Sequence, residues 1–285
     1  MPTLTLLTFI ALALSVGAVW LPRSPRVPLA PWQIWFALAL LCGALSGVLH
    51  APAFIALALF GGAAWLTDAA SKKYLRILFG VVTLVLAFAL AIHKLPGFSN
   101  PVVIAGAVFS AGAKPFTQYA NFDKGAVGLI LLAFICHRTA SLAEFGGVLK
   151  KTLPVLALTV AAVMAFATGV GFVQPAFKLP EVTLQFLAVN LFFTVVAEEA
   201  FFRGFIQARL ASALSGFRHG AWAALLCSAL LFGAAHLAGG PLYAALAAIA
   251  GLGYAYAYHA TQRIEAPILV HIALNAVHFI FFTSP

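Results

Sequence analysis

The strongest constraint on this chain is a succession of long segments with very few charged residues. Each segment is rich in Leu, Val, Ala and Phe, and most approach the roughly 20 apolar residues that an α-helix needs to cross a bilayer. The segments lie at 3–20, 32–49, 52–68, 75–93, 124–137, 153–173, 184–202, 220–237, 241–258 and 266–282. They predict an all-α fold, a polytopic transmembrane helical bundle of about ten spans, with eight as the lower bound.

The overall composition agrees with a membrane environment. Apolar residues make up 64% of the 285 residues and charged residues only 8%, whereas a soluble domain carries about 25% charged residues. The first segment lacks the basic region of a signal peptide, so we take it as a span. We expect a multi-pass integral protein in contact with the lipid bilayer. The composition and the compactness of the chain favour the inner or plasma membrane of a prokaryote.

The basic residues are distributed as expected for loops of a membrane protein. The net charge of +9 could indicate a nucleic-acid partner, but these residues stand singly or in pairs between apolar segments, so no nucleic acid is expected. With the N-terminus outside, the cytoplasmic loops hold Arg23, Arg26, Lys72, Lys73, Arg76, Arg138, Lys150, Lys151, Arg209, Arg218 and Arg263. The outer loops hold Lys94, Lys114, Lys124 and Lys178. This excess of inner charge predicts that both termini lie outside.

The longest segment between spans covers residues 94–123 and contains three prolines and several glycines. We interpret it as an extracytoplasmic loop that could partly re-enter the membrane. It divides the chain into an N-terminal part of membrane helices and this loop, residues 1–123, and a C-terminal helical core, residues 124–285.

Two adjacent acids in an apolar segment are the first candidates for chemistry. Glu198 and Glu199 are two of only seven acids in the chain, and an ionisable group inside a membrane helix costs about 2.5–3.5 kcal/mol on insertion scales. Arg203 follows Glu199 at i,i+4 and can pair with it. Glu198 points about 100° away around an ideal helix, on a face that it shares with Asn190 and Thr194. A purely structural Glu199–Arg203 ion pair remains an alternative.

Later segments add isolated histidines and an asparagine. His236 follows Phe232 by one turn, and His271, Asn275 and His278 share one face of the last segment. A set of Glu, His and Asn can activate a water and stabilise an oxyanion. His236 could instead be interfacial, His271 and Asn275 could only join helices, and His278 is more easily read as structural.

His236 and His271 are predicted near opposite ends of their helices. They can therefore meet only if helices are tilted or broken, which Gly233, Gly239, Gly240 and Pro241 would permit.

Three strings in fixed order resemble the motifs of a known family. EEAFFR contains Glu198, Glu199 and Arg203, FGAAH ends at His236, and HIALN contains His271 and Asn275. They match the EExxxR, FxxxH and HxxxN patterns of the CPBP family, the CAAX protease and bacteriocin-processing family of intramembrane endopeptidases. The resemblance covers about residues 150–285 and includes similarity to the Ras-converting CAAX prenyl endopeptidases.

The resemblance implies a glutamate-type protease. Glu198 and His236 would activate a water, His271 and Asn275 would stabilise the oxyanion, and Glu199 with Arg203 would hold the helix and tune the site. The expected substrate is a membrane-associated or lipidated protein or peptide.

A metalloprotease-like site is the alternative to metal-free catalysis. Glu198, His236 and His271 could bind zinc, but there is no HExxH motif and asparagine is a poor zinc ligand. We therefore expect no cofactor. Two functions outside proteolysis also remain open, a proton-coupled transporter that uses the same groups as a relay and a non-proteolytic membrane scaffold of the same family.

Overall fold

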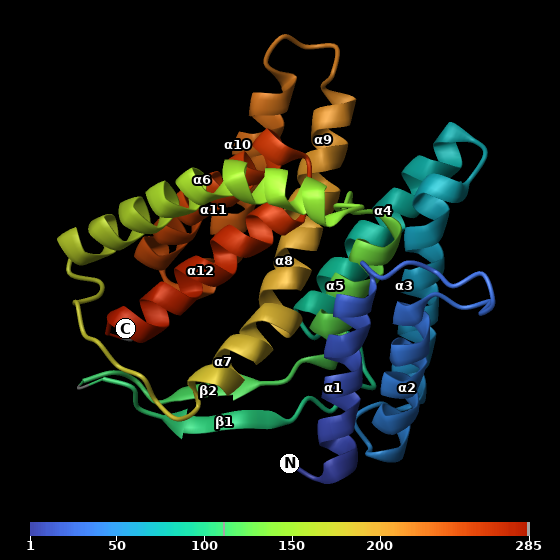
Figure 1. Cartoon of the computed structure of the whole chain (residues 1–285), viewed down its shortest axis with the longest axis horizontal. Helices are drawn as coiled ribbons and strands as arrows, with labels where there is room; N and C mark the ends of the chain where they lie inside the picture. Colours follow the sequence, from blue (N-terminus) through green and yellow to red (C-terminus); the bar gives the residue numbers. More distant parts are fainter. Residues whose placement is uncertain (111, 284–285) are drawn as a thin grey trace. The chain divides into compact units, whose positions relative to one another are not determined.

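The computed structural model describes residues 1–110 and 112–283 and is almost entirely helical (Figure 1). All ten predicted segments are helical, which confirms the helical membrane bundle. Four helical stretches are long and apolar enough to cross a membrane, namely Ala51–Ala69, Lys73–Ala91, Leu142–Gly169 and Thr183–Ala213. Four shorter apolar helices are Thr3–Ala18, Pro31–Leu45, Gly220–Ala235 and Glu265–Phe281. The orientation of the termini stays a prediction.

The chain divides into two compact units. The first comprises residues 1–103, 118–136 and 191–197. Its helices are α1 (Thr3–Ala18), α2 (Pro31–Leu45), α3 (Ala51–Ala69), α4 (Lys73–Ala91) and α5 (Phe122–Phe134). Hydroxyl groups connect α1 to α2 and α3 to α4. Ser15 Oγ donates to the Trp32 carbonyl over 2.8 Å, and the Thr67 and Thr83 hydroxyls lie 3.1 Å apart. Such interhelical hydrogen bonds are typical of membrane bundles, where lipid offers no alternative partner.

Helix α5 forms the core of the first unit. It contacts α1, α3 and α4, and nearly all of its side chains are buried. With 13 residues it spans only about 20 Å. Its buried Asp123 accepts hydrogen bonds from His93 Nδ1 at 2.7 Å and Asn100 Nδ2 at 3.0 Å, as a buried carboxylate requires.

The segment predicted as an irregular outer loop contains a small sheet. Strands β1 (Val102–Ala107) and β2 (Phe116–Tyr119) pair in a two-stranded sheet, which adds a minor β element to the predicted all-α fold. The strand sequences VVIAGA and FTQY contain the β-branched and aromatic residues that favour extended backbone. Span-length patterns cannot detect strands this short.

The second unit comprises residues 104–117, 137–190 and 198–285. Its helices are α6 (Leu142–Gly169), α7 (Thr183–Asn190), the end of α8 (Val196–Glu199), α9 (Ala208–Ala213), α10 (Gly220–Ala235), α11 (Pro241–Thr261) and α12 (Glu265–Phe281). A short 3₁₀ turn, Leu237–Gly239, joins α10 to α11. Gly240 has a φ of 99°, a conformation that suits glycine, and Pro241 begins α11 in its preferred first-turn position.

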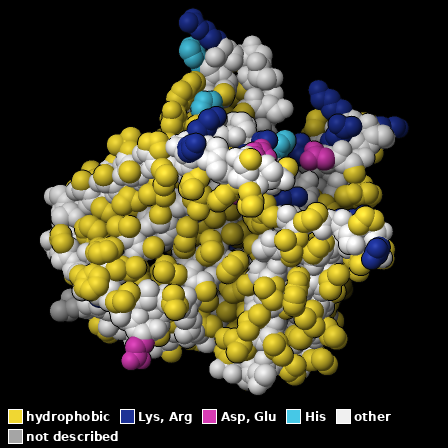
Figure 2. Space-filling view, viewed as in Figure 1, with side chains coloured by type: hydrophobic (Ala, Val, Ile, Leu, Met, Phe, Trp, Pro, Cys, Tyr) yellow, Lys and Arg dark blue, Asp and Glu magenta, His cyan; other side chains and the backbone are white. Residues whose placement is uncertain are grey.

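The outer faces of the second unit are apolar, as contact with lipid requires. Figure 2 shows mostly hydrophobic side chains over the region of α6 and α12, with basic and histidine side chains at the loop between α9 and α10, whose sequence contains Arg218 and His219. Leu158, Leu226 and Leu230 are 72%, 50% and 65% exposed. Contiguous exposed apolar surface of this kind is rare on soluble proteins and marks a membrane surface. The protein is therefore an integral, multi-pass membrane protein.

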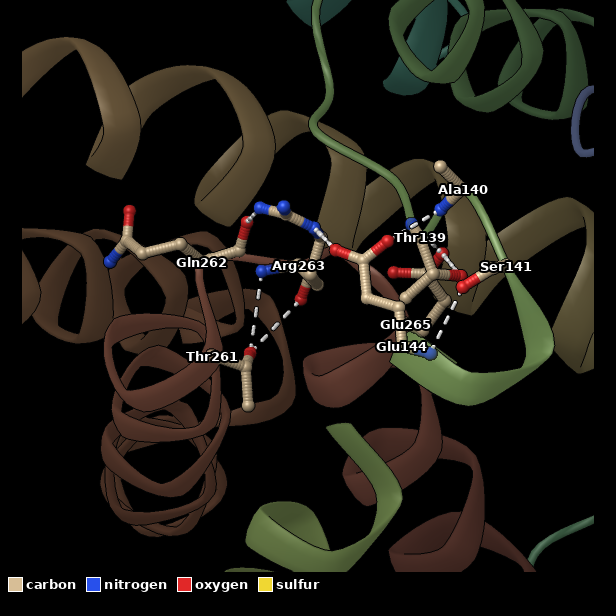
Figure 3. A network of polar contacts seen from close by, with 8 residues as sticks. All are labelled: Thr139, Ala140, Ser141, Glu144, Thr261, Gln262, Arg263 and Glu265. Atoms are coloured by element: carbon tan, nitrogen blue, oxygen red, sulfur yellow. Dashed lines mark hydrogen bonds and ion pairs between the residues drawn. The ribbon is translucent and has the colours of Figure 1, made fainter. Parts of the chain in front are cut away.

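A polar network joins the start of α6 to the start of α12 (Figure 3). Glu265 Oε1 accepts hydrogen bonds of 2.7 Å from both the backbone nitrogen and the hydroxyl of Thr139. Arg263 Nε lies 2.6 Å from Glu144 Oε1. Ser141 caps α6 by accepting from the Glu144 nitrogen at 3.1 Å. The network fixes one end of α6 and of α12, and both helices contribute residues to the lining of a cavity.

Candidate active site

The paired glutamates lie in a helix that departs from α-helical geometry on both sides. Helix α8 contains Glu198 and Glu199 and is flanked by π-helical segments at Leu191–Val195 and Ala200–Gln207. π-helical turns are rare and frequent at functional sites. The idealised 3.6-residue spacing used to predict a shared face for Asn190, Thr194 and Glu198 therefore does not apply through this stretch.

Glu199 lies at the centre of a buried charged cluster. Its Oε1 is 3.1 Å from Arg203 Nη1, and both side chains are fully buried. The same oxygen lies 2.7 Å from Nδ1 of His271. The predicted Glu199–Arg203 pair is thus present. The contact with His271 joins the first and third motifs, which are 72 residues apart.

Arg203 and Gln207 attach the π-helical segment to α11. Arg203 Nη2 donates to the Gly251 carbonyl at 3.1 Å, and Gln207 Nε2 donates to the Ala255 carbonyl at 2.9 Å. The guanidinium also lies over aromatic rings, 4.5 Å from the centroid of Phe232 and 5.2 Å from that of Tyr254. Cation–π contacts of this kind stabilise a desolvated arginine. Arg203 therefore joins three helices around Glu199.

A cavity brings together the histidines and asparagine of the second and third motifs. It has a volume of about 120 Å³, or about 640 Å³ when its open mouth is counted. Its polar lining is His236, Tyr243, Tyr254, His271, Asn275 and His278, and its apolar lining comes mainly from α6 and α11. The volume accommodates several water molecules, each of which needs about 10–15 Å³ measured in this way.

The close approach of α10 and α11 depends on small residues. A methyl group at Gly233 would lie 2.7 Å from the Ala248 side chain and 2.9 Å from the Ala244 carbonyl, so only glycine fits. Helix α10 ends at Ala235, one residue before His236. The predicted break near Gly239 and Gly240 is present, and His236 and His271 line the same cavity.

The hydrogen bonds of two lining residues fix their chemistry. His236 Nδ1 lies 2.8 Å from the Phe232 carbonyl. A carbonyl only accepts, so this nitrogen carries the proton and the neutral ring keeps an acceptor at Nε2. Asn275 Nδ2 donates to Asn190 Oδ1 at 2.9 Å, which leaves its amide with a second N–H. One acceptor and one donor are thus available at the cavity.

Glu198 is half-buried and interacts electrostatically with three groups around the cavity, the side chains of Arg203, Tyr243 and Tyr254. Two of these line the cavity itself. Of the six predicted site residues, Glu199 contacts both Arg203 and His271, and His236, His271 and Asn275 share the cavity. Glu198 is not among the residues that line the cavity, and these electrostatic interactions relate it to Arg203 and to the two lining tyrosines.

The described groups do not fit a metal site. Within residues 1–110 and 112–283, no three His, Cys, Asp or Glu side chains are placed to hold a metal ion, including Glu198, His236 and His271. His271 uses Nδ1 for Glu199, and the neighbouring Asn275 is a poor zinc ligand. No step of the reaction proposed below is therefore assigned to a metal.

Two tyrosines at the cavity were missed in the sequence. Tyr254 stacks on His271 with ring centroids 4.4 Å apart, and the Tyr243 ring lies 5.6 Å from that of His236. They are 11 residues apart, which is three turns and the same face of a helix. This spacing, in a segment otherwise rich in alanine and glycine, is the signal that could have identified them.

Residues 180–277 match the family model described as type II CAAX prenyl endopeptidase Rce1-like. The matched segment contains all six predicted site residues, from Glu198 to Asn275. The match confirms the resemblance that the three motifs indicated. Neither the curated proteins nor the solved structures gave a match to the chain.

Proposed function

Because residues 180–277 match the family model described as type II CAAX prenyl endopeptidase Rce1-like, we propose that this protein is an intramembrane endopeptidase of glutamate type. The observation that carries the proposal is the single cavity lined by His236, His271 and Asn275, three polar residues from two motifs. Glu199 of the remaining motif bonds directly to His271. Polar groups converge in this way inside membrane helices where they serve a function.

The nucleophile in this proposal is a water in the cavity. Nε2 of His236 accepts a hydrogen bond from the water, since Nδ1 donates to the Phe232 carbonyl. Glu198 acts as general base and takes one proton as the water oxygen attacks the peptide carbonyl carbon. Glu198 then returns that proton to the nitrogen of the leaving amine, so the two products are a carboxylic acid and an amine.

The oxyanion is stabilised from α12. Asn275 has a second N–H beyond the one bonded to Asn190, and a donor of this kind contributes about 2.7–4 kcal/mol to the transition state. His271 donates from Nε2 when its ring is charged, because Nδ1 already donates to Glu199. Glu199 and Arg203 are positioning residues in this scheme, since they act through His271 and the helix.

The substrate is proposed to be a membrane-associated, prenylated protein or peptide, in keeping with the name of the matched family. The reaction requires no cofactor. We assign the activity to the C-terminal part, residues 124–285, because residues 1–123 contain none of the three motifs. The proposed location is the inner or plasma membrane of a prokaryote.

The direct test is cleavage of a prenylated CAAX peptide by the purified protein in detergent or vesicles. Glu198→Ala and His236→Ala should each abolish cleavage, while the elution volume and the thermal unfolding midpoint stay close to those of the wild type. Glu181→Ala and His219→Ala are matched controls, because both side chains are exposed in the same unit, and both should remain active. Full activity in a correctly folded Glu198→Ala or His236→Ala variant would exclude the mechanism.

A further inference from the structure

The segment between α6 and α7, residues 170–182, runs beside the C-terminal end of α12, and we call it the strap. Backbone nitrogens of Ala176 and Lys178 donate to the carbonyls of Phe281 and Ile280 over 2.8 and 2.7 Å. In return, the Thr283 nitrogen donates to the Gln174 carbonyl at 2.8 Å. These bonds hold the strap in fixed register against the last residues of the helix that carries His271 and Asn275.

This register places a positive charge at the end of α12. Lys178 Nζ donates to the Phe282 carbonyl, and it lies 5.8 Å from the centroid of the Phe279 ring. Partial burial lowers the pKa of Lys178 below its ordinary value, because desolvation disfavours the charged form. No acidic side chain among the described residues forms an ion pair with Lys178. An ammonium group has three donors, so it retains donors for an anionic partner.

A second polar group, His278, lies on α12 between Asn275 and Phe282, the residue that Lys178 contacts. His278 lines the cavity, and its Nε2 is buried without a hydrogen-bond partner in the part of the chain that the structure describes. Lys178 and His278 interact electrostatically. A buried polar atom without a partner costs roughly 1–3 kcal/mol, and its presence in a residue that lines the cavity points to a ligand group that completes it.

The spacing along α12 gives the length of that ligand. Phe282 follows Asn275 by seven residues, and at 1.5 Å per helical residue this corresponds to roughly 10 Å. Three extended residues of a peptide also span roughly 10 Å. A peptide bond held at Asn275, with its downstream residues running along α12, would therefore bring the end of the third residue to Lys178. A CAAX sequence has three residues after its cysteine.

We propose that Lys178 binds the C-terminal α-carboxylate of the substrate, with His278 contacting the peptide between that carboxylate and the scissile bond. The proposal rests on the endopeptidase function proposed above. It makes Lys178 a specificity residue that measures three residues from the cleaved bond to a free chain end. The enzyme would thus select C-terminal tails over internal peptide segments in the same membrane.

The test compares two prenylated CAAX peptides of identical sequence, one with a free C-terminal carboxylate and one with a C-terminal amide. The wild type should cleave the acid with a kcat/KM about 10- to 100-fold higher than the amide, mainly through KM, since hydrogen bonds to charged groups are of this strength. Lys178→Gln should raise KM for the acid until the two peptides differ less than about threefold. The activity of Lys178→Gln on the amide peptide should match that of the wild type. Lys178→Arg should keep the preference for the acid over the amide.

Lys150→Gln is the matched control, because Lys150 is an exposed lysine nearer the start of α6, and it should leave the preference intact. A peptide lengthened by one residue should lose the preference even with wild-type enzyme, which tests the register without a variant. Equal cleavage of acid and amide by the wild type would overturn the role of Lys178 and leave the endopeptidase standing. Cleavage of neither peptide would instead overturn the proposed function.

Discussion

Nδ1 of His271 lies 2.7 Å from Oε1 of Glu199, a fully buried carboxylate oxygen that also contacts Arg203. An ionised carboxylate only accepts hydrogen bonds, so the imidazole must donate from Nδ1. The neutral ring then has an acceptor at Nε2, and only the charged ring can donate there. In the proposed reaction, Glu199 therefore orients the His271 ring, and Nε2 donates to the oxyanion when the ring is charged.

Replacement of Glu199 by glutamine tests this role. Glutamine keeps the size of the side chain but removes the negative charge that contacts the His271 ring. We expect Glu199→Gln to lower kcat by about 10²–10³-fold, the range for loss of one oxyanion donor, with little change in KM. The measurement is steady-state cleavage of a prenylated CAAX peptide at several concentrations.

His236, another histidine that lines the cavity, serves as an internal control in the same variant. His236 bonds to a backbone carbonyl rather than to Glu199, so its ring should be unaffected by Glu199→Gln. NMR of labelled histidines should show a changed environment for His271 and an unchanged one for His236. A wild-type kcat in Glu199→Gln would show that Glu199 only holds Arg203.

Removal of Arg203 should be far more damaging to the fold than removal of the whole ion pair. Arg203→Met leaves Glu199 as a buried charge with one fewer partner, and such changes cost about 3–5 kcal/mol. The double variant Glu199→Gln, Arg203→Met removes both charges and should recover a large part of this loss. Thermal unfolding in detergent, analysed as a double-mutant cycle, measures the coupling.

Arg218 provides a matched control for this cycle, because it is an exposed arginine in the loop before α10. Arg218→Met should change neither the unfolding midpoint of the wild type nor that of the Glu199→Gln variant. A double variant less stable than Arg203→Met alone would contradict the reading of Arg203 as the counter-charge of Glu199.

The sequence predicted the Glu199–Arg203 contact because it is local. Glu199 and Arg203 are four residues apart on one continuous helix, and the long arginine side chain reaches the carboxylate although Arg203 itself lies in a π-helical segment. The approach of His271 to Glu199 depends on how α12 packs against the π-helical segment, and a single sequence contains no measure of that packing. The motifs identified the participants, but not that the second glutamate rather than the first bonds to His271.

Helix α5 and the small sheet show a similar limit. The apolar pattern of α5 predicted a helix correctly, but hydrophobicity does not distinguish a helix facing lipid from one buried among its neighbours. The sheet of β1 and β2 joins segments of four and six residues, too short for any periodic signal. In both cases the missing information is which surface a segment contacts.

Asn275, which lines the cavity, and its hydrogen-bond partner Asn190 should show a graded effect on catalysis. Asn275→Ala removes a proposed oxyanion donor and should lower kcat by about 10²–10³-fold. Asn190→Ala removes only the acceptor that orients the Asn275 amide, so the expected loss is about tenfold or less, within the effect of one neutral hydrogen bond. Asn100→Ala removes a hydrogen bond to Asp123 in the other unit and should not alter kcat. A larger loss in Asn190→Ala than in Asn275→Ala would reverse the assignment.

The network of Figure 3 predicts a difference between two carboxylates that lie close together. Glu265 is 7% exposed and accepts two hydrogen bonds from Thr139, so Glu265→Ala should lower the free energy of unfolding by about 1–3 kcal/mol. Glu144 pairs with Arg263 at the surface, where ion pairs contribute little, and Glu144→Ala should have the smaller effect. Both variants should keep their activity per folded molecule, because the network lies outside the cavity lining. Unfolding midpoints and cleavage rates measured on the same preparations decide the point, and an equal or larger loss of stability in Glu144→Ala would show that burial does not set the contribution of Glu265.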